Sequence, residues 1–275
     1  MTPSTTSVTP VRVAAVQMVS GPDVAANLAA IDRLVGEAAA AGARLVALPE
    51  YCVMLSADPR DKLGIREADG DGPIQRALAD CARRHKVWLV GGTVPLEAGD
   101  AERVRNSCLV YDDQGERVAR YDKLHLFAFR HGTEHYDEGA TIECGSEVVS
   151  FDGPCGPTGL SVCYDLRFPE LFRHLGHMQL LVLPAAFTAT TGQAHWEVLL
   201  RARAIENQCY VLASAQGGTH AGGRQTWGHS MLIDPWGTVL ASLPTGEGVV
   251  TGEVDPARIA DVRARLPALA HRRLD

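Results

Sequence analysis

Cys163 is the residue of this chain whose surroundings best suit nucleophilic chemistry. It stands at the end of the apolar run 159–162 and directly before a charged, proline-containing stretch, residues 164–170. This setting places a side chain at the carboxyl end of a buried strand and the start of a helix, where backbone N–H groups are free to stabilise an anion. Alternatively, Cys163 is a small buried hydrophobic residue, as most free cysteines are.

Two further polar residues follow strand-like segments: Glu50 follows residues 45–49, and Lys123 follows residues 118–122. Each has an ordinary explanation, because an acid can cap a turn and a lysine can lay its stem along apolar surface. However, sites in open α/β sheets form at strand ends, so these two residues and Cys163 can converge in one cleft. Together they offer a general base, a cation for an oxyanion and a nucleophile, which is what thiol-dependent acyl transfer needs.

The segments that must position these residues alternate between strand and helix patterns. Strand patterns cover residues 11–16, 44–48, 87–94, 107–111, 117–121, 159–163, 180–184, 210–215, 230–234, 238–242 and 248–254, and helix patterns cover 27–41, 73–85, 169–175, 196–207 and 256–265. Turns at 112–115 and 235–237 predict antiparallel hairpins, and continuous apolar runs predict strands covered on both faces. We therefore expect a single-domain α/β fold, a four-layer α-β-β-α sandwich with two mixed β-sheets.

Composition narrows the classes of partner and compartment. A net charge of −7 argues against nucleic acid or an anionic membrane as the main partner, and no apolar run approaches the length of a membrane helix. The seven cysteines are scattered without CxxC spacing, which indicates a reduced cytoplasmic protein without a metal site. The polar N-terminus lacks the features of a signal peptide. We expect a flexible N-terminal segment, residues 1–9, and one domain over residues 10–275.

Three segments resemble the signature segments of the carbon–nitrogen hydrolase (nitrilase) superfamily, and they occur in the family's order. They are Leu-Pro-Glu at 48–50, Tyr-Asp-Lys-Leu-His-Leu-Phe at 121–127 and Ser-Val-Cys-Tyr-Asp-Leu-Arg-Phe-Pro-Glu at 161–170. The resemblance extends from about residue 11 to residue 273. Three ordered motifs, each at a predicted strand end, are a far more specific signal than any one of them alone.

The resemblance implies a role for each matching residue. Glu50 is the general base, Lys123 stabilises the tetrahedral intermediate, and Cys163 is the nucleophile. The backbone N–H of Tyr164 is the second oxyanion donor. The implied reaction passes through a thioester that water hydrolyses, and it uses no cofactor and no metal.

The family also uses a second glutamate between the lysine and the cysteine, which positions the substrate and supports the lysine. The loop 131–139 offers three acids, Glu134, Asp137 and Glu138. The family pattern has an aromatic residue two positions before this glutamate and a small residue after it, which selects Glu138 and leaves Glu134 as the poorer candidate. Residues 143–145 depart from the family's usual Pro-Gly, which puts the conformation of this loop in question.

Residues 163–170, 194–206 and 227–237 resemble the amidase branch of the superfamily that hydrolyses ω-amides of 2-oxo acids. This implies a cysteine-dependent amidase of linear carboxamides, with deaminated glutathione as the favoured substrate. The alternatives are ω-amidase activity on 2-oxoglutaramate or 2-oxosuccinamate, hydrolysis of N-carbamoyl amino acids, and a catalytically silent binding protein of the same fold.

The favoured substrates carry carboxylates, so a cation is expected near the pocket. Arg167 is one candidate, although an arginine in this place is equally often part of a structural ion pair. Residues 266–273 resemble a C-terminal segment of the family that helps subunits associate, which implies a homodimer or a larger homo-oligomer.

Overall fold

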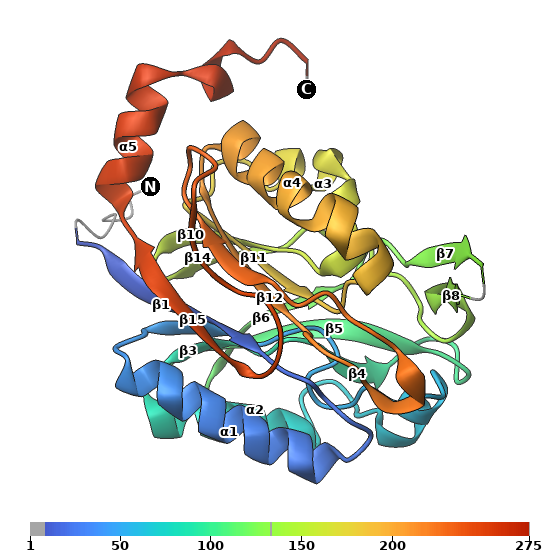
Figure 1. Cartoon of the computed structure of the whole chain (residues 1–275). Coiled ribbons are helices and arrows are strands. Elements are labelled where there is room, and N and C mark those ends of the chain that lie inside the picture. The colour runs from blue at the N-terminus through green and yellow to red at the C-terminus, as the bar shows by residue number, and fades with distance from the viewer. Residues whose placement is uncertain (1–8, 133, 275) are drawn as a thin grey trace.

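The computed structural model describes residues 9–132 and 134–274, so all but the last residue of the predicted segment 1–9 lies outside the described part. Two large sheets form its centre (Figure 1). The strands of the first sheet are β1 (Val11–Gln17), β2 (Leu45–Ala47), β3 (Trp88–Val90), β4 (Val94–Glu97), β5 (Val104–Tyr111), β6 (Arg117–Asp122) and β15 (Gly248–Val254). Those of the second are β9 (Ser150–Gly153), β10 (Gly156–Leu160), β11 (Leu180–Ala185), β12 (Tyr210–Ala215), β13 (Ser230–Ile233) and β14 (Val239–Leu243).

Both sheets are mixed. The first has the order β15-β1-β2-β3-β5-β4, with β6 also paired to β5, and the second has the order β14-β13-β12-β11-β10-β9. The central pairs β1–β2, β2–β3, β10–β11 and β11–β12 are parallel, and the outer pairs are antiparallel. The parallel centres bring the carboxyl ends of β2 and β11 to one end of the sandwich, where sites of α/β proteins form.

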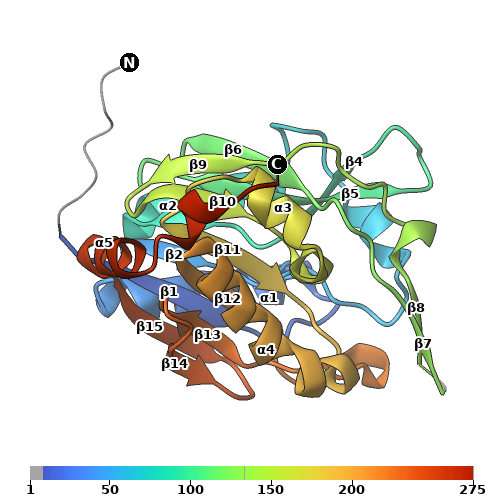
Figure 2. The ribbon, with the colours of Figure 1, turned by 90° about the horizontal axis from the view of Figure 1, so that it is seen from above.

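Helices cover the outer face of each sheet. The α-helices are α1 (Val24–Ala40), α2 (Pro73–His85), α3 (Pro169–His174), α4 (Ala189–Asn207) and α5 (Pro256–Arg265). Helices α1 and α2 lie against the first sheet and α3 and α4 against the second, while α5 extends from the edge beside β15 (Figures 1 and 2). The expected four-layer α-β-β-α sandwich is confirmed.

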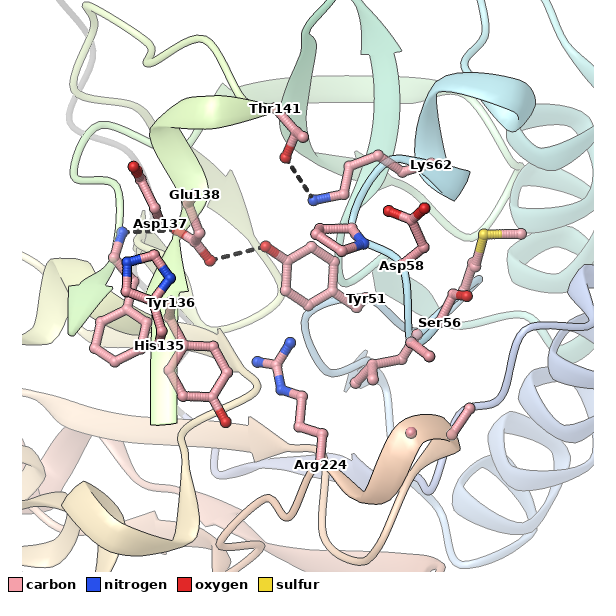
Figure 3. Close-up of a pocket in the computed structure, with 17 residues that line it drawn as sticks. Tyr51, Ser56, Asp58, Lys62, His135, Tyr136, Asp137, Glu138, Thr141 and Arg224 are labelled. Atoms are coloured by element: carbon pink, nitrogen blue, oxygen red, sulfur yellow. Dashed lines mark hydrogen bonds between the residues drawn. The ribbon is translucent and has the colours of Figure 1, made fainter. Parts of the chain in front are cut away.

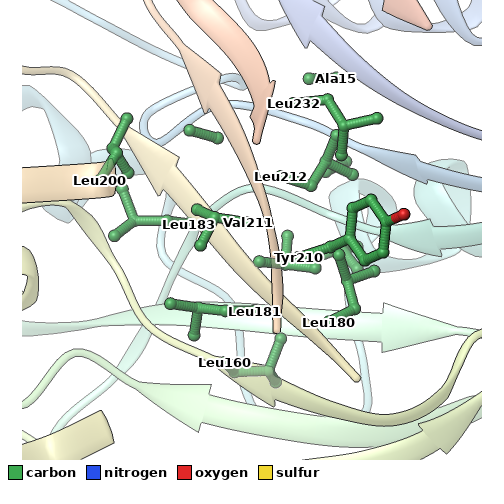
Figure 4. Packing of buried hydrophobic residues seen from close by; sticks show 14 of the residues in the cluster. Ala15, Leu160, Leu180, Leu181, Leu183, Leu200, Tyr210, Val211, Leu212 and Leu232 are labelled. Atoms are coloured by element: carbon green, nitrogen blue, oxygen red, sulfur yellow. The ribbon is translucent and has the colours of Figure 1, made fainter. Parts of the chain in front are cut away.

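Strand β1 shows why the apolar runs are continuous. Val13 and Ala15 point into the core between the sheets, whereas Ala14 and Val16 point into the core beneath α1 and α2. Because successive side chains of a strand face opposite sides, a strand with helices on one face and a second sheet on the other needs apolar residues on both faces. The polar residues of β1, Arg12 and Gln17, lie near its two ends. Figure 4 shows part of the resulting core, in which side chains from β10, β11 and β12 belong to one buried cluster.

Several elements differ from the expectation. The run 87–94 is not one strand, because the chain turns between β3 and β4 at Gly92, whose φ is 62° and where a Cβ would lie 2.2 Å from the Pro49 carbonyl oxygen. Only glycine fits that close approach. A short hairpin, β7 (Ala128–His131) with β8 (Glu134–Asp137), and strand β9 were not predicted.

Some predicted bounds were also wrong: α4 begins at Ala189 rather than at residue 196, and β10 ends at Leu160, so Cys163 is not in a strand. Short 3₁₀ helices, which a period-based pattern does not show, were not predicted either. They are η1 (Asp61–Ile65), η2 (Glu138–Ala140), η3 (Cys163–Arg167), η4 (Ala221–Gly223) and η5 (Ala268–His271). Among the described residues, every helix is too short or too polar to traverse a lipid bilayer.

Candidate active site

Four chain segments deliver the predicted site residues to one end of the sandwich. Glu50 lies three residues beyond β2, and Lys123 directly follows β6. Cys163 opens η3 three residues beyond β10, and Glu138 opens η2 directly after β8. The sequence places these residues up to 113 positions apart, and the two sheets bring them together.

Lys123 is the centre of the polar cluster. Its Nζ donates to Glu50 Oε1 at 2.8 Å and to Glu138 Oε2 at 2.7 Å, and its side chain is 0% exposed. A buried ammonium is stable only when it is paired and hydrogen-bonded, and two carboxylates meet that need here. Burial opposes the charge, but the two carboxylates outweigh it, so the Lys123 pKa is raised well above its ordinary value. Lys123 is therefore a fixed cation.

The Glu50 carboxylate is held at both oxygens. Asn106 Nδ2 donates to Oε1 at 2.9 Å, and the Ala186 backbone N–H donates to Oε2 at 3.0 Å. Because Asn106 comes from β5 and Ala186 from the end of β11, both sheets fix this carboxylate. A carboxylate held by three donors, Lys123, Asn106 and the Ala186 N–H, is oriented before any substrate arrives.

The Glu138 carboxylate is held in the same way. Tyr51 Oη donates to Oε1 at 2.8 Å, and the Phe127 backbone N–H donates to Oε2 at 2.8 Å. Burial tends to raise the Glu138 pKa, but Lys123 and these hydrogen bonds prevail, so that pKa is lowered. The cluster thus holds two carboxylates and one ammonium.

Cys163 has an uncommon backbone conformation. Its φ is 50°, in the left-handed region that non-glycine residues rarely adopt, at a cost of about 1 kcal/mol or more. The turn ends the extended segment and starts η3 at once. The thiol is turned toward a small pocket that Glu138, Tyr164 and Ala186 also line.

The surroundings of the Cys163 thiol disfavour its thiolate form. Burial is the main cause that raises its pKa well above the ordinary value, and Glu50 raises it further. Lys123 and a hydrogen bond with the Ala186 backbone act in the opposite direction without prevailing. Since the thiolate is the nucleophilic form of a cysteine, Cys163 can act as a nucleophile only with a base that takes its proton.

Asp165 ties the cysteine turn to the lysine strand. Its Oδ2 accepts from Tyr121 Oη at 2.7 Å and from the Val162 N–H at 2.8 Å, while its Oδ1 accepts from the His125 N–H at 3.0 Å. The residue is fully buried. One carboxylate thereby fixes the strand end before Lys123 and the turn that carries Cys163.

A cavity of about 220 Å³ opens beside the cluster (Figure 3). Tyr51, Glu138, Lys62 and Arg224 line it, together with residues of the β7–β8 hairpin. Phe127, Glu138 and Arg224 also line the small pocket at Cys163, so the cavity and the pocket are neighbours. The arrangement offers a nucleophile in a narrow recess and a wider space for the rest of a small molecule.

Not every predicted residue has a place in the site. Arg167 lines neither the cavity nor the pocket; its guanidinium lies over the rings of Tyr164 and Phe187, 5.6 and 5.1 Å from their centroids. Tyr164 follows Cys163 in η3, where the first N–H groups of a helix have no partner in their own helix. The side chain of Glu134 lies outside the described residues.

Sequence reasoning missed several residues of the site. Tyr51 and Asn106 could have been found from their positions in the sequence, because Tyr51 directly follows Glu50 and Asn106 is a polar amide within a buried strand. Nothing in the sequence pointed to Lys62 or Arg224, because Lys62 lies in a 3₁₀ helix and Arg224 lies beside a glycine-rich turn.

Within the described part of the chain, one group of side chains has the spacing of metal ligands: Asp32, Cys81 and His85, whose ligand atoms lie within 4.8 Å of one another. The group joins α1 to α2 on the outside of the first sheet. Asp32 already accepts from Arg84 at 2.6 Å and contacts His85 at 2.9 Å. Its observed role is therefore that of a surface ion pair between two helices.

Known proteins are similar to this chain over nearly its whole length. Residues 12–264 match the carbon-nitrogen hydrolase family. The deaminated glutathione amidase of Yersinia enterocolitica is 39% identical over 95% of this chain and 93% of its own length, and omega-amidase NIT2 of Mus musculus is 35% identical over 96% and 95%. The crystal structure of Saccharomyces cerevisiae Nit3, a member of branch 10 of the nitrilase superfamily, superposes with a TM-score of 0.85 at 29% identity, covering 96% of this chain and 97% of that one.

The family match spans most of the chain, and relatives above 30% identity align over nearly all of it. These findings agree with the buried carboxylate, ammonium and thiol groups at the strand ends. The chain therefore belongs to the carbon–nitrogen hydrolase family, in its amidase branch, and is a hydrolase of carbon–nitrogen bonds other than peptide bonds.

Proposed function

We propose that the protein is a deaminated glutathione amidase in which Cys163 is the nucleophile, Glu50 the general base and Lys123 the cation that stabilises the oxyanion. The observation that carries this proposal is the buried ion cluster of Lys123 with Glu50 and Glu138, which adjoins the pocket of Cys163. Both named amidases to which the chain is similar support the reaction class.

The first half-reaction forms a thioester. Glu50 takes the proton of the Cys163 thiol while sulfur attacks the amide carbonyl carbon, and the carbonyl electron pair moves to oxygen. Lys123 and the backbone N–H of Tyr164 stabilise that oxyanion. When the oxyanion collapses, the carbon–nitrogen bond breaks, and the proton held by Glu50 passes to the leaving nitrogen.

The second half-reaction releases the acid. Glu50 accepts a proton from a water molecule, and the oxygen of that water attacks the thioester carbonyl carbon. The carbon–sulfur bond then breaks, and the proton held by Glu50 passes to the Cys163 sulfur, which restores both groups. Glu138 supports both steps by accepting a second hydrogen bond from Lys123, beside the one that Glu50 accepts.

The high pKa of the Cys163 thiol agrees with this sequence of events. A resting thiolate would be open to oxidation, whereas a thiol that transfers its proton to Glu50 during attack is protected until a substrate is bound. The chemistry asks for no acid or base beyond Glu50 itself.

The test is product release from purified protein. Deaminated glutathione should yield 2-oxoglutarate and cysteinylglycine, with a larger kcat/KM than 2-oxoglutaramate, an N-carbamoyl amino acid or a nitrile. Cys163→Ala should abolish the release, while the matched variant Cys144→Ala, which changes an exposed cysteine, should retain it. Preference for 2-oxoglutaramate would instead support ω-amidase activity, and full activity of Cys163→Ala would refute the mechanism.

We also propose that the protein is a cytoplasmic homo-oligomer. All seven cysteines are free, which suits a reducing compartment. Val198 and Ile205 on α4 and Trp236 in the β13–β14 turn are large apolar side chains that are 68, 47 and 54% exposed. Apolar side chains gathered on one part of a surface are typical of an association interface.

A further inference from the structure

The cavity beside the catalytic cluster contains two cations whose role is still to be explained, Lys62 and Arg224. Lys62 belongs to η1 and Arg224 follows η4, so they come from segments 162 residues apart. Figure 3 shows them on either side of the Tyr51 ring, with Lys62 Nζ 5.3 Å and the Arg224 guanidinium carbon 5.8 Å from its centroid. They therefore mark two separate positions in the cavity.

Neither cation is neutralised by an ion pair within the described residues. Lys62 Nζ donates to the Thr141 hydroxyl at 3.3 Å, and Arg224 Nη2 donates to the Ala186 carbonyl at 3.2 Å, both neutral acceptors. Arg224 Nε is buried and makes no hydrogen bond to the described part of the chain. A buried donor without an acceptor is unfavourable, and a bound ligand that accepts from it would remove that cost.

The local charge favours an anion. Glu50, Glu138 and Lys123 together carry one net negative charge, and Lys62 and Arg224 change that balance to one net positive charge. The other carboxylates of the cavity belong to Asp58 and Asp137, which are exposed to solvent, whereas Lys62 and Arg224 are partly buried. Charges in partly buried places are screened less than charges in water, so the two cations prevail inside.

The two positions differ in their distance from the reacting atoms. Arg224 lines both the cavity and the small pocket of Cys163, whereas Lys62 lines the cavity but not that pocket. A carboxylate near the scissile amide can thus meet Arg224, and a carboxylate farther along the molecule can meet Lys62. Deaminated glutathione has both, since its oxo acid end and its glycine end each carry one.

We propose that Arg224 and Lys62 are the specificity-determining residues of this site, with Arg224 binding the carboxylate close to the scissile amide and Lys62 binding a second, more distant one. The inference rests on the proposed amidase function and adds the class of substrate: linear amides with a carboxylate near the reacting carbonyl, and preferably another at the far end. The contribution of the Lys62 ammonium should decline as pH rises through about 8, because burial lowers its pKa to about 8.

The test compares three amides: deaminated glutathione, succinamate and butyramide. Succinamate and butyramide form a matched pair, because a carboxylate in one replaces a methyl group in the other. Arg224→Gln should raise KM at least about tenfold for succinamate and deaminated glutathione, with kcat nearly unchanged, and leave butyramide unaffected. Arg224→Lys should restore part of the affinity, since it restores the charge without the fork of donors.

Lys62→Met should raise KM for deaminated glutathione and spare both short amides. The matched controls are Arg103→Gln, in an exposed ion pair with Asp100, and Lys86→Met, exposed after α2; neither should change any parameter. If a short amide is too poor a substrate, inhibition of deaminated glutathione turnover by succinate gives the same comparison, with a weaker succinate affinity expected in Arg224→Gln.

The outcomes separate the two proposals. If the wild-type protein hydrolyses none of the amides, the proposed function is wrong. If it hydrolyses them and Arg224→Gln loses activity equally on succinamate and butyramide, Arg224 is structural and the specificity inference is wrong. Unchanged kinetics in both Arg224→Gln and Lys62→Met would also show that the specificity inference is wrong.

Discussion

At the scale of single residues, the site combines a fixed cation with an unactivated nucleophile. Lys123 stays charged because two carboxylates hold it, and Cys163 stays protonated because burial and Glu50 oppose a thiolate. The pair therefore does not exist as a resting thiolate–ammonium ion pair. In the proposed mechanism, charge on sulfur develops only as Glu50 takes the proton during attack.

This state of the thiol can be measured directly. A Cys163 pKa raised well above the ordinary cysteine value means that the thiol stays protonated as pH rises from about 6 to 9, where an ordinary cysteine begins to ionise. The ultraviolet thiolate absorbance of wild type minus Cys163→Ser should therefore stay flat over that range. A thiolate band near neutral pH that disappears in Cys163→Ser would contradict this assignment.

The second glutamate can be tested by a matched pair of variants. Glu138→Gln removes one of the two charges that hold Lys123, so the cation and its oxyanion stabilisation lose their fixed position. We expect kcat on deaminated glutathione to fall by about 10²-fold. Glu134→Gln should change kcat by less than about twofold, because the motif selects Glu138. The reverse order of effects would show that the wrong glutamate was chosen.

Residue types and strand ends were enough to find Glu50, Lys123 and Cys163 in the sequence, whereas Glu138 was selected only by its resemblance to the family pattern. A polar group that ends a buried strand must face either solvent or a cleft, and the family motif selects the cleft. Arg224 could not be found in this way, since its place depends on how a glycine-rich turn folds over Tyr51. Such a contact depends on tertiary packing and produces no periodic pattern in the sequence.

At the scale of elements, the positions of helices and buried strands follow from periodicity, and the short elements do not. Helices α2 and α5 begin and end where the pattern predicted. Each begins at a proline, which suits the first position of a helix, and each carries basic residues in its last turn, which suits the C-terminal end. Hairpin β7–β8 has mostly polar, exposed side chains, and η3 has a single turn. Neither has enough apolar positions to show a period.

The link between β6 and η3 can be tested through Asp165. Asp165→Asn removes the charge that accepts from Tyr121, Val162 and His125, and leaves an amide NH₂ among donors. We expect the free energy of unfolding to fall by about 2–4 kcal/mol and kcat to fall with it, because the Cys163 turn loses its anchor. Denaturant melts and kinetics measure the two effects.

The matched control is Asp152→Asn, an exposed position on β9. It should shift the free energy of unfolding by less than about 0.5 kcal/mol. Equal effects at the two positions would show that Asp165 is not an anchor.

At the scale of the whole molecule, two sheets with buried faces form a rigid base from which the site residues project. The core between the sheets is continuous with the core beneath α3 and α4, and the strands that carry Lys123 and Cys163 belong to opposite sheets. Activity and global stability are therefore linked through the packing of the sandwich.

A truncation in the core between the sheets should lower the stability of the whole molecule. Leu212→Ala on β12 empties a fully buried position and should lower the free energy of unfolding by about 2–5 kcal/mol. Leu240→Ala on β14, where the side chain is 48% exposed, should cost far less. Denaturant melts of both variants check this prediction, and equal losses would show that the inter-sheet core is not the main source of stability.

The proposed oligomer belongs to this scale too. Light scattering should give a mass that is a multiple of the chain mass, and Val198→Glu should shift it toward the single chain, because a charge in an apolar interface is unfavourable. A single-chain mass for the wild-type protein would contradict the proposal.

The central claim is that the acyl group of the substrate is transferred to Cys163. The direct measurement is peptide mass spectrometry of the wild-type protein, mixed with deaminated glutathione and quenched in acid within the first turnovers. The account predicts one 2-oxoglutaryl group on the peptide that contains Cys163, and none in Cys163→Ser. Steady turnover with an unmodified Cys163 peptide, or an acyl group on another residue, would contradict it.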